Sequence, residues 1–257
     1  MNKPTKSLVK RPPLRNPGDS LNEEFNKQFL DRVVLWLVVP LGGFCLAFYE
    51  WMRWLFHLPV QPLTLTFLFL FSVGLSVYMI RRAWGKLRQL RLGLEGERYV
   101  GHFLQNSLLR SGYWVIHDIE GNGFNIDHTV IGPTGVFSVE TKARTKPNGE
   151  AKVTFDGEKL LVAGYVPDRD PVNQAKAASK SLAAILRDQG IPSVQVQPVV
   201  LFPEWFVEAP LDSGVWVHNE KFFVKRLETL PVRLSDKEVF ALAAALGRYV
   251  RDRQEKK

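Results

Sequence analysis

Two long, uncharged, apolar runs near the N-terminus constrain this 257-residue chain more than any other feature. The first covers the 17 residues from Val33 to Tyr49, and the second covers the 18 residues from Leu63 to Ile80. A helix needs roughly 17 to 25 apolar residues to cross the hydrocarbon core of a bilayer. Trp51 and Trp54 lie between the runs, as aromatic residues do at a membrane interface. We therefore predict two transmembrane helices within residues 33–80, and the alternative is a helix pair buried in a soluble core.

The charge distribution predicts which way this helix pair faces. Residues 1–32 carry an excess of three positive charges and residues 81–92 an excess of five, which together make up the formal net charge of +8. Basic segments that flank membrane helices stay on the cytoplasmic side. We therefore predict a disordered basic cytoplasmic arm over residues 1–32, a basic juxtamembrane segment over residues 81–92, and a cytoplasmic domain over residues 93–257. Both termini are then cytoplasmic, in a membrane protein with two spans.

The charge counts do not indicate that the domain over residues 93–257 binds nucleic acid. Residues 93–257 contain 21 basic and 21 acidic side chains, so the sequence pI near 9.6 does not arise from this domain. A basic surface for nucleic acid is therefore not indicated by charge. The single cysteine, Cys45, excludes an intrachain disulfide and a cysteine-based zinc site.

Apolar periodicity after residue 93 predicts a mixed α/β domain with a C-terminal helix. A helical period opens the domain, and strands with turn residues between them follow. Asp170 and Pro171 start a second helix that Gly190 ends, and Ser235 with Glu238 forms a capping box for the last helix. The expected helix and strands before Asp170 are 94–110, 113–119, 125–131, 136–143, 153–155 and 159–162, and later strands are 199–202 and 215–217.

Three residues on two successive predicted strands form the candidate site. Glu140 and Lys142 are two residues apart, so they share one face of a strand, and Asp127 lies on the preceding strand across a short turn. Two carboxylates suit Mg²⁺, and a neighbouring lysine can assist a water molecule or stabilise charge on a phosphate. This arrangement is the one needed for metal-assisted phosphodiester hydrolysis. The alternative is an exposed Glu/Lys face with Asp127 capping a turn.

Glu97 and Gln174 are further candidates on the flanking helices. Glu97 lies at the inward edge of the first helix, on the side of Val100 and Leu104. Gln174 is in register with Ala178 on the inward face of the second helix, with the alternative of an ordinary helix residue. Asp127 and Glu140 lie in otherwise apolar strands. Burying a charge there is costly unless the charge is paired or has a function such as binding a metal.

Four motifs, in the same order along the chain, resemble those of the nuclease-related domain (NERD) family of the PD-(D/E)xK nuclease superfamily. The resemblance covers roughly residues 93–205 and rests on Gly96-Glu97, Phe124 to His128, Gly135 to Lys142, and Asp170 to Ala175. It implies a restriction-endonuclease-like mixed sheet flanked by helices. The run from Ala143 to Gly149 departs from the family pattern as a lengthened loop.

The resemblance also implies roles for the candidate residues. Asp127 and Glu140 would bind Mg²⁺ or Mn²⁺, Lys142 would be the catalytic lysine, Glu97 a supporting acid, and Gln174 a residue bordering the site. We expect a membrane-anchored, metal-dependent nuclease that hydrolyses phosphodiester bonds, in DNA, with a possible protein partner to supply affinity. The competing expectation is a membrane-tethered nucleic-acid-binding or scaffold module that keeps the fold without turnover.

Overall fold

The computed structural model describes residues 14–58, 62–121, 123–147, 152–191 and 194–255. The chain forms two compact units. One consists of Leu21–Arg91, and the other of Met1–Ser20 together with Leu92–Lys257. The first 13 residues of the expected arm, and Asn148 and Gly149 of the expected long loop, lie outside the described residues.

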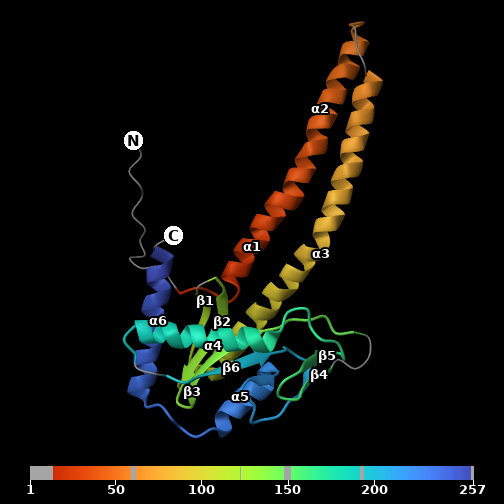
Figure 1. Ribbon diagram of the computed structural model, residues 1–257. Coiled ribbons are helices and arrows are strands. Elements are labelled where there is room, and N and C mark those ends of the chain that lie inside the picture. Colours follow the sequence, from red (N-terminus) through yellow and green to blue (C-terminus); the bar gives the residue numbers. More distant parts are fainter. Residues whose placement is uncertain (1–13, 59–61, 122, 148–151, 192–193, 256–257) are drawn as a thin grey trace, which may run out of the picture. The chain divides into compact units, whose positions relative to one another are not determined.

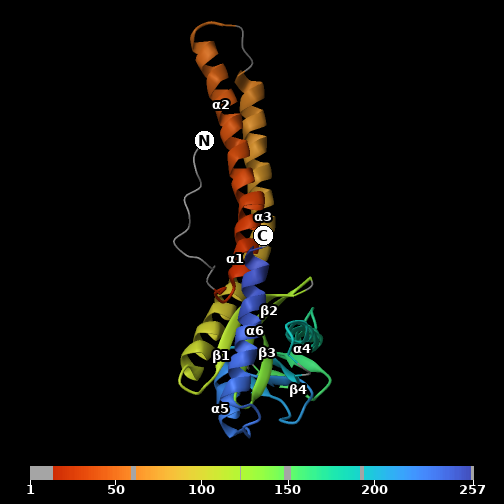
Figure 2. The same ribbon diagram turned by 90° about the vertical axis from the view of Figure 1, so that its left-hand side faces the viewer.

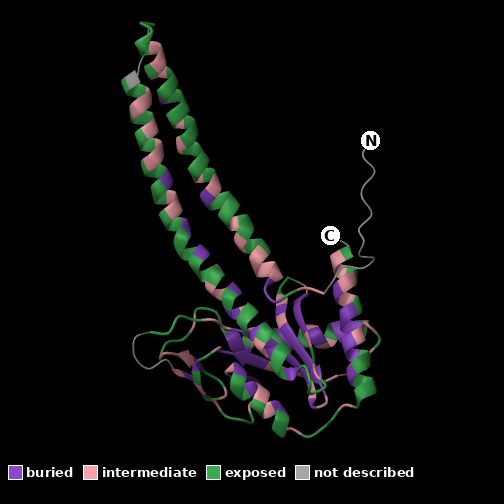
Figure 3. Cartoon of the chain, turned by 180° about the vertical axis from the view of Figure 1, so that it is seen from behind, coloured by how far each residue is buried: buried purple, intermediate pink, exposed green. Residues whose placement is uncertain are grey.

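The unit Leu21–Arg91 is helical. It contains most of α1 (Asp19–Phe29), a π-helical turn (Leu30–Val34), α2 (Leu35–Leu55) and the first part of α3 (Pro62–Leu108). Two of its helices are long and apolar enough to cross a membrane, and only 11% and 6% of their most apolar windows are buried (Figure 3). The two predicted apolar runs therefore form helices whose apolar side chains the protein itself leaves uncovered.

Small and aromatic side chains pair α2 with α3 inside this unit. The rings of Phe44 and Phe69 lie 5.9 Å apart, and a Cβ atom on Gly43 would lie 3.2 Å from the Oγ atom of Ser72. Glycine at this position permits the close approach that is typical of paired membrane helices.

The second unit is built on a five-stranded mixed sheet with the order β1-β2-β3-β6-β8 (Figure 1). Strands β1, β2 and β3 are antiparallel neighbours, whereas β6 and β8 continue parallel to β3. The tight turn between β2 and β3 pairs Gly132 with Gly135 and so fixes the register of the two strands that carry the candidate site. The strand bounds are Trp114–Glu120, Asn125–Gly132, Gly135–Thr141, Val196–Leu201 and Trp216–His218.

Helices cover both faces of this sheet, with the strands between them (Figure 2). On one face, α4 (Pro171–Asp188) and α6 (Asp236–Glu255) pack Leu182 and Leu246 onto isoleucines of β1 and β2. On the other, the last turns of α3 and α5 (Glu220–Thr229) bury Leu104 and Phe223 against β3 and β6. The predicted α/β class is confirmed, as a mixed sheet flanked by helices.

A second, three-stranded sheet has the order β5-β4-β7. Its strands are β4 (Lys152–Phe155), β5 (Leu160–Val162) and β7 (Phe206–Glu208), and Trp205 is buried beside it in a cluster with Val200 of β6. The hairpin β4-β5 falls where the sequence predicts it. Strand β7 and helix α5 were not predicted, because β7 has three residues with an exposed Phe206, and α5 is a short helix of ten residues.

The part of the expected arm that the structure describes, from Leu14 onward, is ordered and not disordered as predicted. Pro17 and Gly18 are buried, and Leu14 packs against the core cluster of α4 and α6. Helix α1 begins at Asp19. Local composition predicts disorder here because the segment is polar and rich in proline, and only contacts with distant residues order it.

Candidate active site

The register of β2 and β3 brings Asp127 and Glu140 together. His128 pairs with Val139 in the ladder, and Asp127 and Glu140 are the next residues along the two strands. The backbone N–H of Thr141 donates a 2.7 Å hydrogen bond to Oδ2 of Asp127, which fixes that carboxylate at the end of β3. The hairpin therefore positions both candidate metal ligands by backbone geometry alone.

Glu140 and Lys142 meet on one face of β3, as their spacing predicts. The ammonium of Lys142 lies 2.5 Å from Oε1 of Glu140, and the two side chains are 18% and 13% exposed. Most of this ion pair is therefore shielded from solvent, unlike the exposed pair of the alternative interpretation. A charge-assisted contact of this kind is stronger than a neutral hydrogen bond.

Glycine at position 96 lets α3 approach the end of β3. A Cβ atom on Gly96 would lie 2.3 Å from the Cβ of Ala143, which is closer than side-chain carbons approach one another. The next residue of the helix, Glu97, is half-buried, whereas Glu95 is exposed, as the helical period predicts. The Gly-Glu pair therefore has a physical explanation, because the glycine permits the approach that brings the glutamate toward Lys142.

The electrostatics of the site link three carboxylates to one lysine. Burial, together with the negative charges of Asp118 and Glu140 and a partial offset by Lys142, raises the pKa of Glu97 to about 7. Burial also raises the pKa of Asp127 well above its usual range, and the charges of Glu140 and Glu97 add to this effect. The carboxylates repel one another, and a cation placed among them would relieve that repulsion.

Gln174 lies near the start of α4, where Asp170 caps the helix by accepting hydrogen bonds from the backbone of Val172 and Asn173 at 2.9 Å and 3.2 Å. Its amide oxygen is buried and has no hydrogen-bond partner in the described part of the chain. The structure thus leaves this acceptor unsatisfied, but no hydrogen bond joins it to the carboxylates. A buried acceptor without a partner costs about 1 to 3 kcal/mol, which a ligand or water at this position would offset.

The donor set fits a magnesium ion that keeps part of its hydration shell. Among the described residues, no three or more His, Cys, Asp or Glu side chains are placed to hold one ion by themselves. Mg²⁺ is usually bound through one or two carboxylates, with water and substrate phosphate completing its coordination. Asp127 and Glu140 could supply these two carboxylates; burial raises the pKa of Asp127, and the charges of Glu140 and Glu97 add to that effect.

Asp118 and a pair of histidines belong to this region, although sequence reasoning gave them no role. Asp118 is buried in β1 and adopts a left-handed φ of 51°. The Nδ1 atoms of His117 and His128 lie 3.0 Å apart, and burial lowers the pKa of His117 to about 4 and that of His128 well below its usual range. A charged residue within the apolar run of β1 was the available signal for Asp118, and it is the same signal that marks Asp127.

Together the mixed sheet, its flanking helices and this carboxylate–lysine cluster define an α/β domain of the restriction-endonuclease-like class. The family model described as nuclease-related domain matches residues 92–203, and this part of the chain is a nuclease-related domain. The matched range contains every residue of the predicted site. No curated protein and no solved structure matches the chain.

Proposed function

We propose that this protein is a membrane-anchored nuclease that hydrolyses phosphodiester bonds in DNA with Mg²⁺ or Mn²⁺. The observation that carries the proposal is the convergence of Asp127, Glu140 and Lys142 at the end of one hairpin, inside a nuclease-related domain. The two apolar helices support the anchor. The basic segments that flank them support a cytoplasmic position for the domain and both termini.

Each site residue has a distinct task in this hydrolysis. A water oxygen bonds to phosphorus as the ester bond to the leaving sugar oxygen breaks, and that oxygen takes up a proton. Asp127 and Glu140 would hold the metal ion, whose positive charge would polarise the phosphate and make a water molecule more acidic. The ammonium of Lys142 orients the attacking water and stabilises charge on the phosphate oxygens. Glu97, with a pKa of about 7, is suited to take the proton from the water near neutral pH.

The proposal is tested by DNA cleavage with the full chain in detergent micelles or nanodiscs. Wild type is compared with Glu140→Gln and Lys142→Met, using plasmid and linear DNA with Mg²⁺, Mn²⁺ or chelator, and RNA in parallel. Glu95→Gln is the matched control, because Glu95 is an exposed carboxylate two residues from Glu97. We expect metal-dependent cleavage by wild type and by the control, and a loss of roughly 100-fold or more in the two site variants.

The other outcomes are equally informative. If the protein cleaved RNA alone, the substrate would be RNA instead of DNA, and the proposed hydrolysis mechanism would stand. A folded wild-type protein that binds no Mn²⁺ and cleaves neither nucleic acid would overturn the proposal. The scaffold interpretation, in which the fold is kept without turnover, would then explain the domain.

A further inference from the structure

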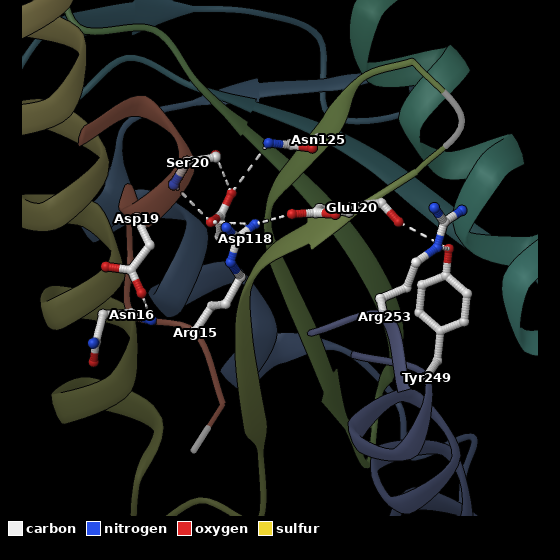
Figure 4. Close-up of polar contacts among 9 residues, drawn as sticks. All are labelled: Arg15, Asn16, Asp19, Ser20, Asp118, Glu120, Asn125, Tyr249 and Arg253. Carbon is white, nitrogen blue, oxygen red and sulfur yellow. Dashed lines mark hydrogen bonds and ion pairs between the residues drawn. The ribbon is translucent and has the colours of Figure 1, made fainter. Parts of the chain in front are cut away.

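A short segment that precedes the first apolar helix packs against the nuclease-related domain beside the candidate site. We call residues Leu14 to Ser20 the strap. Arg15, whose side chain is 7% exposed, lies 3.1 Å from the carboxylate of Asp118 and 2.5 Å from that of Glu120, both on β1. A charge this well shielded from solvent is costly to bury unless an opposite charge is paired with it. The strap is thus attached to β1 through a buried ion-pair network (Figure 4).

Ser20 holds the same aspartate from the other end of the strap. Its backbone N–H donates a 2.9 Å hydrogen bond to Oδ2 of Asp118, and its hydroxyl donates to Oδ1. Asn125 of β2 adds a longer contact of 3.4 Å to Oδ1. Figure 4 shows the Asp118 carboxylate between Ser20, Asn125 and Arg15. Asp118 is therefore held from both ends of the strap.

Asp118 lies level with the candidate metal ligand Asp127 along the ladder of β1 and β2. The β1–β2 register passes from His117–His128 to Ile119–Ile126, and Asp118 and Asp127 at the position between them are not registered as partners. The left-handed φ of 51° at Asp118 accompanies this interruption. A non-glycine residue keeps such a conformation where the surrounding contacts favour it. Here Arg15 and Ser20 both contact the Asp118 carboxylate.

The strap also touches the helix that carries Glu97. A Cβ atom on Gly101 of α3 would lie 2.5 Å from Cγ of Pro17, so the strap lies directly on the helix backbone. Gly18, with φ of +73°, lies so close to α3 that its Cβ would be 2.6 Å from Leu94 and 3.5 Å from Oε2 of Glu97. The strap therefore reaches both sides of the site, β1 through Asp118 and α3 through Glu97.

We propose that the strap completes the active site, and that Arg15 and Ser20 are positioning residues that hold Asp118, and through it Asp127 and Glu97, in the arrangement that binds metal. This inference rests on the proposed nuclease function and extends it. The part of the chain that matches the family begins at residue 92, so the strap is supplied from outside it, by the segment that leads into the first apolar helix.

The test measures Mn²⁺ affinity and DNA cleavage for the full chain in detergent, with Arg15→Ala, Arg15→Lys and Ser20→Ala. Arg253→Ala is the matched control, because Arg253 contacts Tyr249, which in turn donates to the backbone carbonyl of Glu120 at 2.8 Å (Figure 4). It removes an arginine that supports the same strand from α6 rather than from the strap. Mn²⁺ affinity is followed by calorimetry, and unfolding by urea.

We expect Arg15→Ala to weaken Mn²⁺ binding and to lower kcat by roughly 10- to 100-fold, the usual effect of removing a residue that orients a metal ligand. KM for DNA should change little. Arg15→Lys should recover most of the loss, and Ser20→Ala, which keeps its backbone bond, should lose less and remain folded. Arg253→Ala should bind Mn²⁺ as wild type does.

Two results would overturn the proposal in distinguishable ways. If Arg15→Ala and Ser20→Ala unfold more easily but retain wild-type Mn²⁺ affinity and kcat, the strap only stabilises the domain, and the nuclease proposal stands. If folded wild type neither binds Mn²⁺ nor cleaves nucleic acid, the proposed function is overturned, and the positioning role of the strap with it.

Discussion

Lys142 is the cationic side chain that offsets the negative charge of the three carboxylates in the site. It forms an ion pair with Glu140, and its charge lowers the pKa values of Glu97 and Asp127 against the larger effects that raise them. In the absence of metal the lysine is therefore the main counter-charge. A bound divalent ion would take over this part of its role and leave the ammonium available for the substrate.

Replacing Lys142 by methionine should therefore destabilise the metal-free protein in a pH-dependent way. Glu97 and Asp127 have raised pKa values in the folded state, so the stability they contribute is lost as pH rises and they ionise. We expect a loss of roughly 1.5 to 3 kcal/mol in unfolding free energy at pH 8, typical for a hydrogen bond to a charged group, and a smaller loss at pH 5.5. Urea unfolding at the two pH values measures this. An equal loss at both values would contradict the electrostatic explanation.

A second, independent prediction concerns His218 and the pH dependence of folding stability. Burial, with a smaller effect from the neighbouring guanidinium of Arg226, 2.9 Å from Nε2, lowers the pKa of His218 to about 4. The unfolded chain, with an ordinary pKa of 6.5, takes up a proton that the folded chain rejects. Stability is therefore present above pH 6.5 and is lost as pH falls toward 4, by on the order of 3 kcal/mol.

A His218→Gln variant isolates this contribution, because glutamine can accept the hydrogen bond from Arg226 and does not titrate. Urea unfolding of wild type and variant at pH 7 and pH 4.5 should show a shallower pH dependence in the variant. His117 and His128, which remain in both proteins, contribute in the same direction and cancel in the comparison. Parallel pH profiles would show that His218 is not the source.

At the scale of elements, the contact of α3 with the end of β3 sets the position of Glu97. Gly96→Ala should force the helix away from Ala143, because the new methyl group would start 2.3 Å from the Cβ of that residue. Overpacking of this kind costs about 1 to 3 kcal/mol, and it should also weaken Mn²⁺ binding by displacing Glu97. Thermal unfolding with and without Mn²⁺ measures both effects.

Gly85 provides the control for this substitution within the same helix. No heavy atom lies within 4 Å of a Cβ placed there, so Gly85→Ala should gain helix propensity, up to about 1 kcal/mol, without a clash. If Gly96→Ala proved as harmless as Gly85→Ala, the close approach of α3 to Ala143 would be wrong, and with it the explanation of the Gly-Glu pair.

Elements with a strong local pattern were predictable from the sequence, and those ordered by distant contacts were not. The hairpin of β2 and β3 has apolar strands and a turn of glycines, so the pairing of Asp127 with Glu140 and Lys142 could be predicted. The strap has no local pattern that favours order. Its ion pair joins Arg15 to Glu120, 105 residues along the chain, and only the folded sheet brings these charges together.

Helix α4 illustrates the intermediate case. Its start at Asp170 and Pro171 was predicted from capping chemistry, and the structure confirms both. The inward face that carries Gln174 followed from the helical period, and its amide oxygen is buried. Whether that oxygen faces a ligand depends on how α4 packs against β3 and β6, which periodicity does not determine.

At the scale of the whole molecule, the compact unit that contains the nuclease-related domain is discontinuous in sequence. The chain leaves this unit after Ser20, forms the helical unit, and returns at Leu92. A fragment that begins at residue 92 would therefore lack the strap. We expect such a fragment to show lower Mn²⁺ affinity than the full chain, and a synthetic peptide of residues 10–22 should restore part of it. Equal affinity of fragment and full chain would contradict this.

The orientation of the helical unit can be tested through the cysteine content of the chain. Cys45 is the single cysteine, so Cys45→Ser gives a background in which one introduced thiol reports one position. His57, just after α2, and Lys237, in α6, are both exposed. Positive-inside topology places position 57 outside and position 237 in the cytoplasm, because the basic residues flank the helix pair on its outer ends.

In right-side-out membrane vesicles, a charged maleimide that does not cross bilayers should label His57→Cys at once and Lys237→Cys only after detergent is added. Labelling of Lys237→Cys in intact vesicles, with protection of His57→Cys, would invert the topology and place the carboxylate site away from cytoplasmic DNA. Recovery of the full chain in the soluble fraction would show that the protein is not anchored in a membrane. In that case the uncovered apolar surfaces of α2 and α3 would require a protein partner, because surfaces this large and apolar do not remain exposed to water.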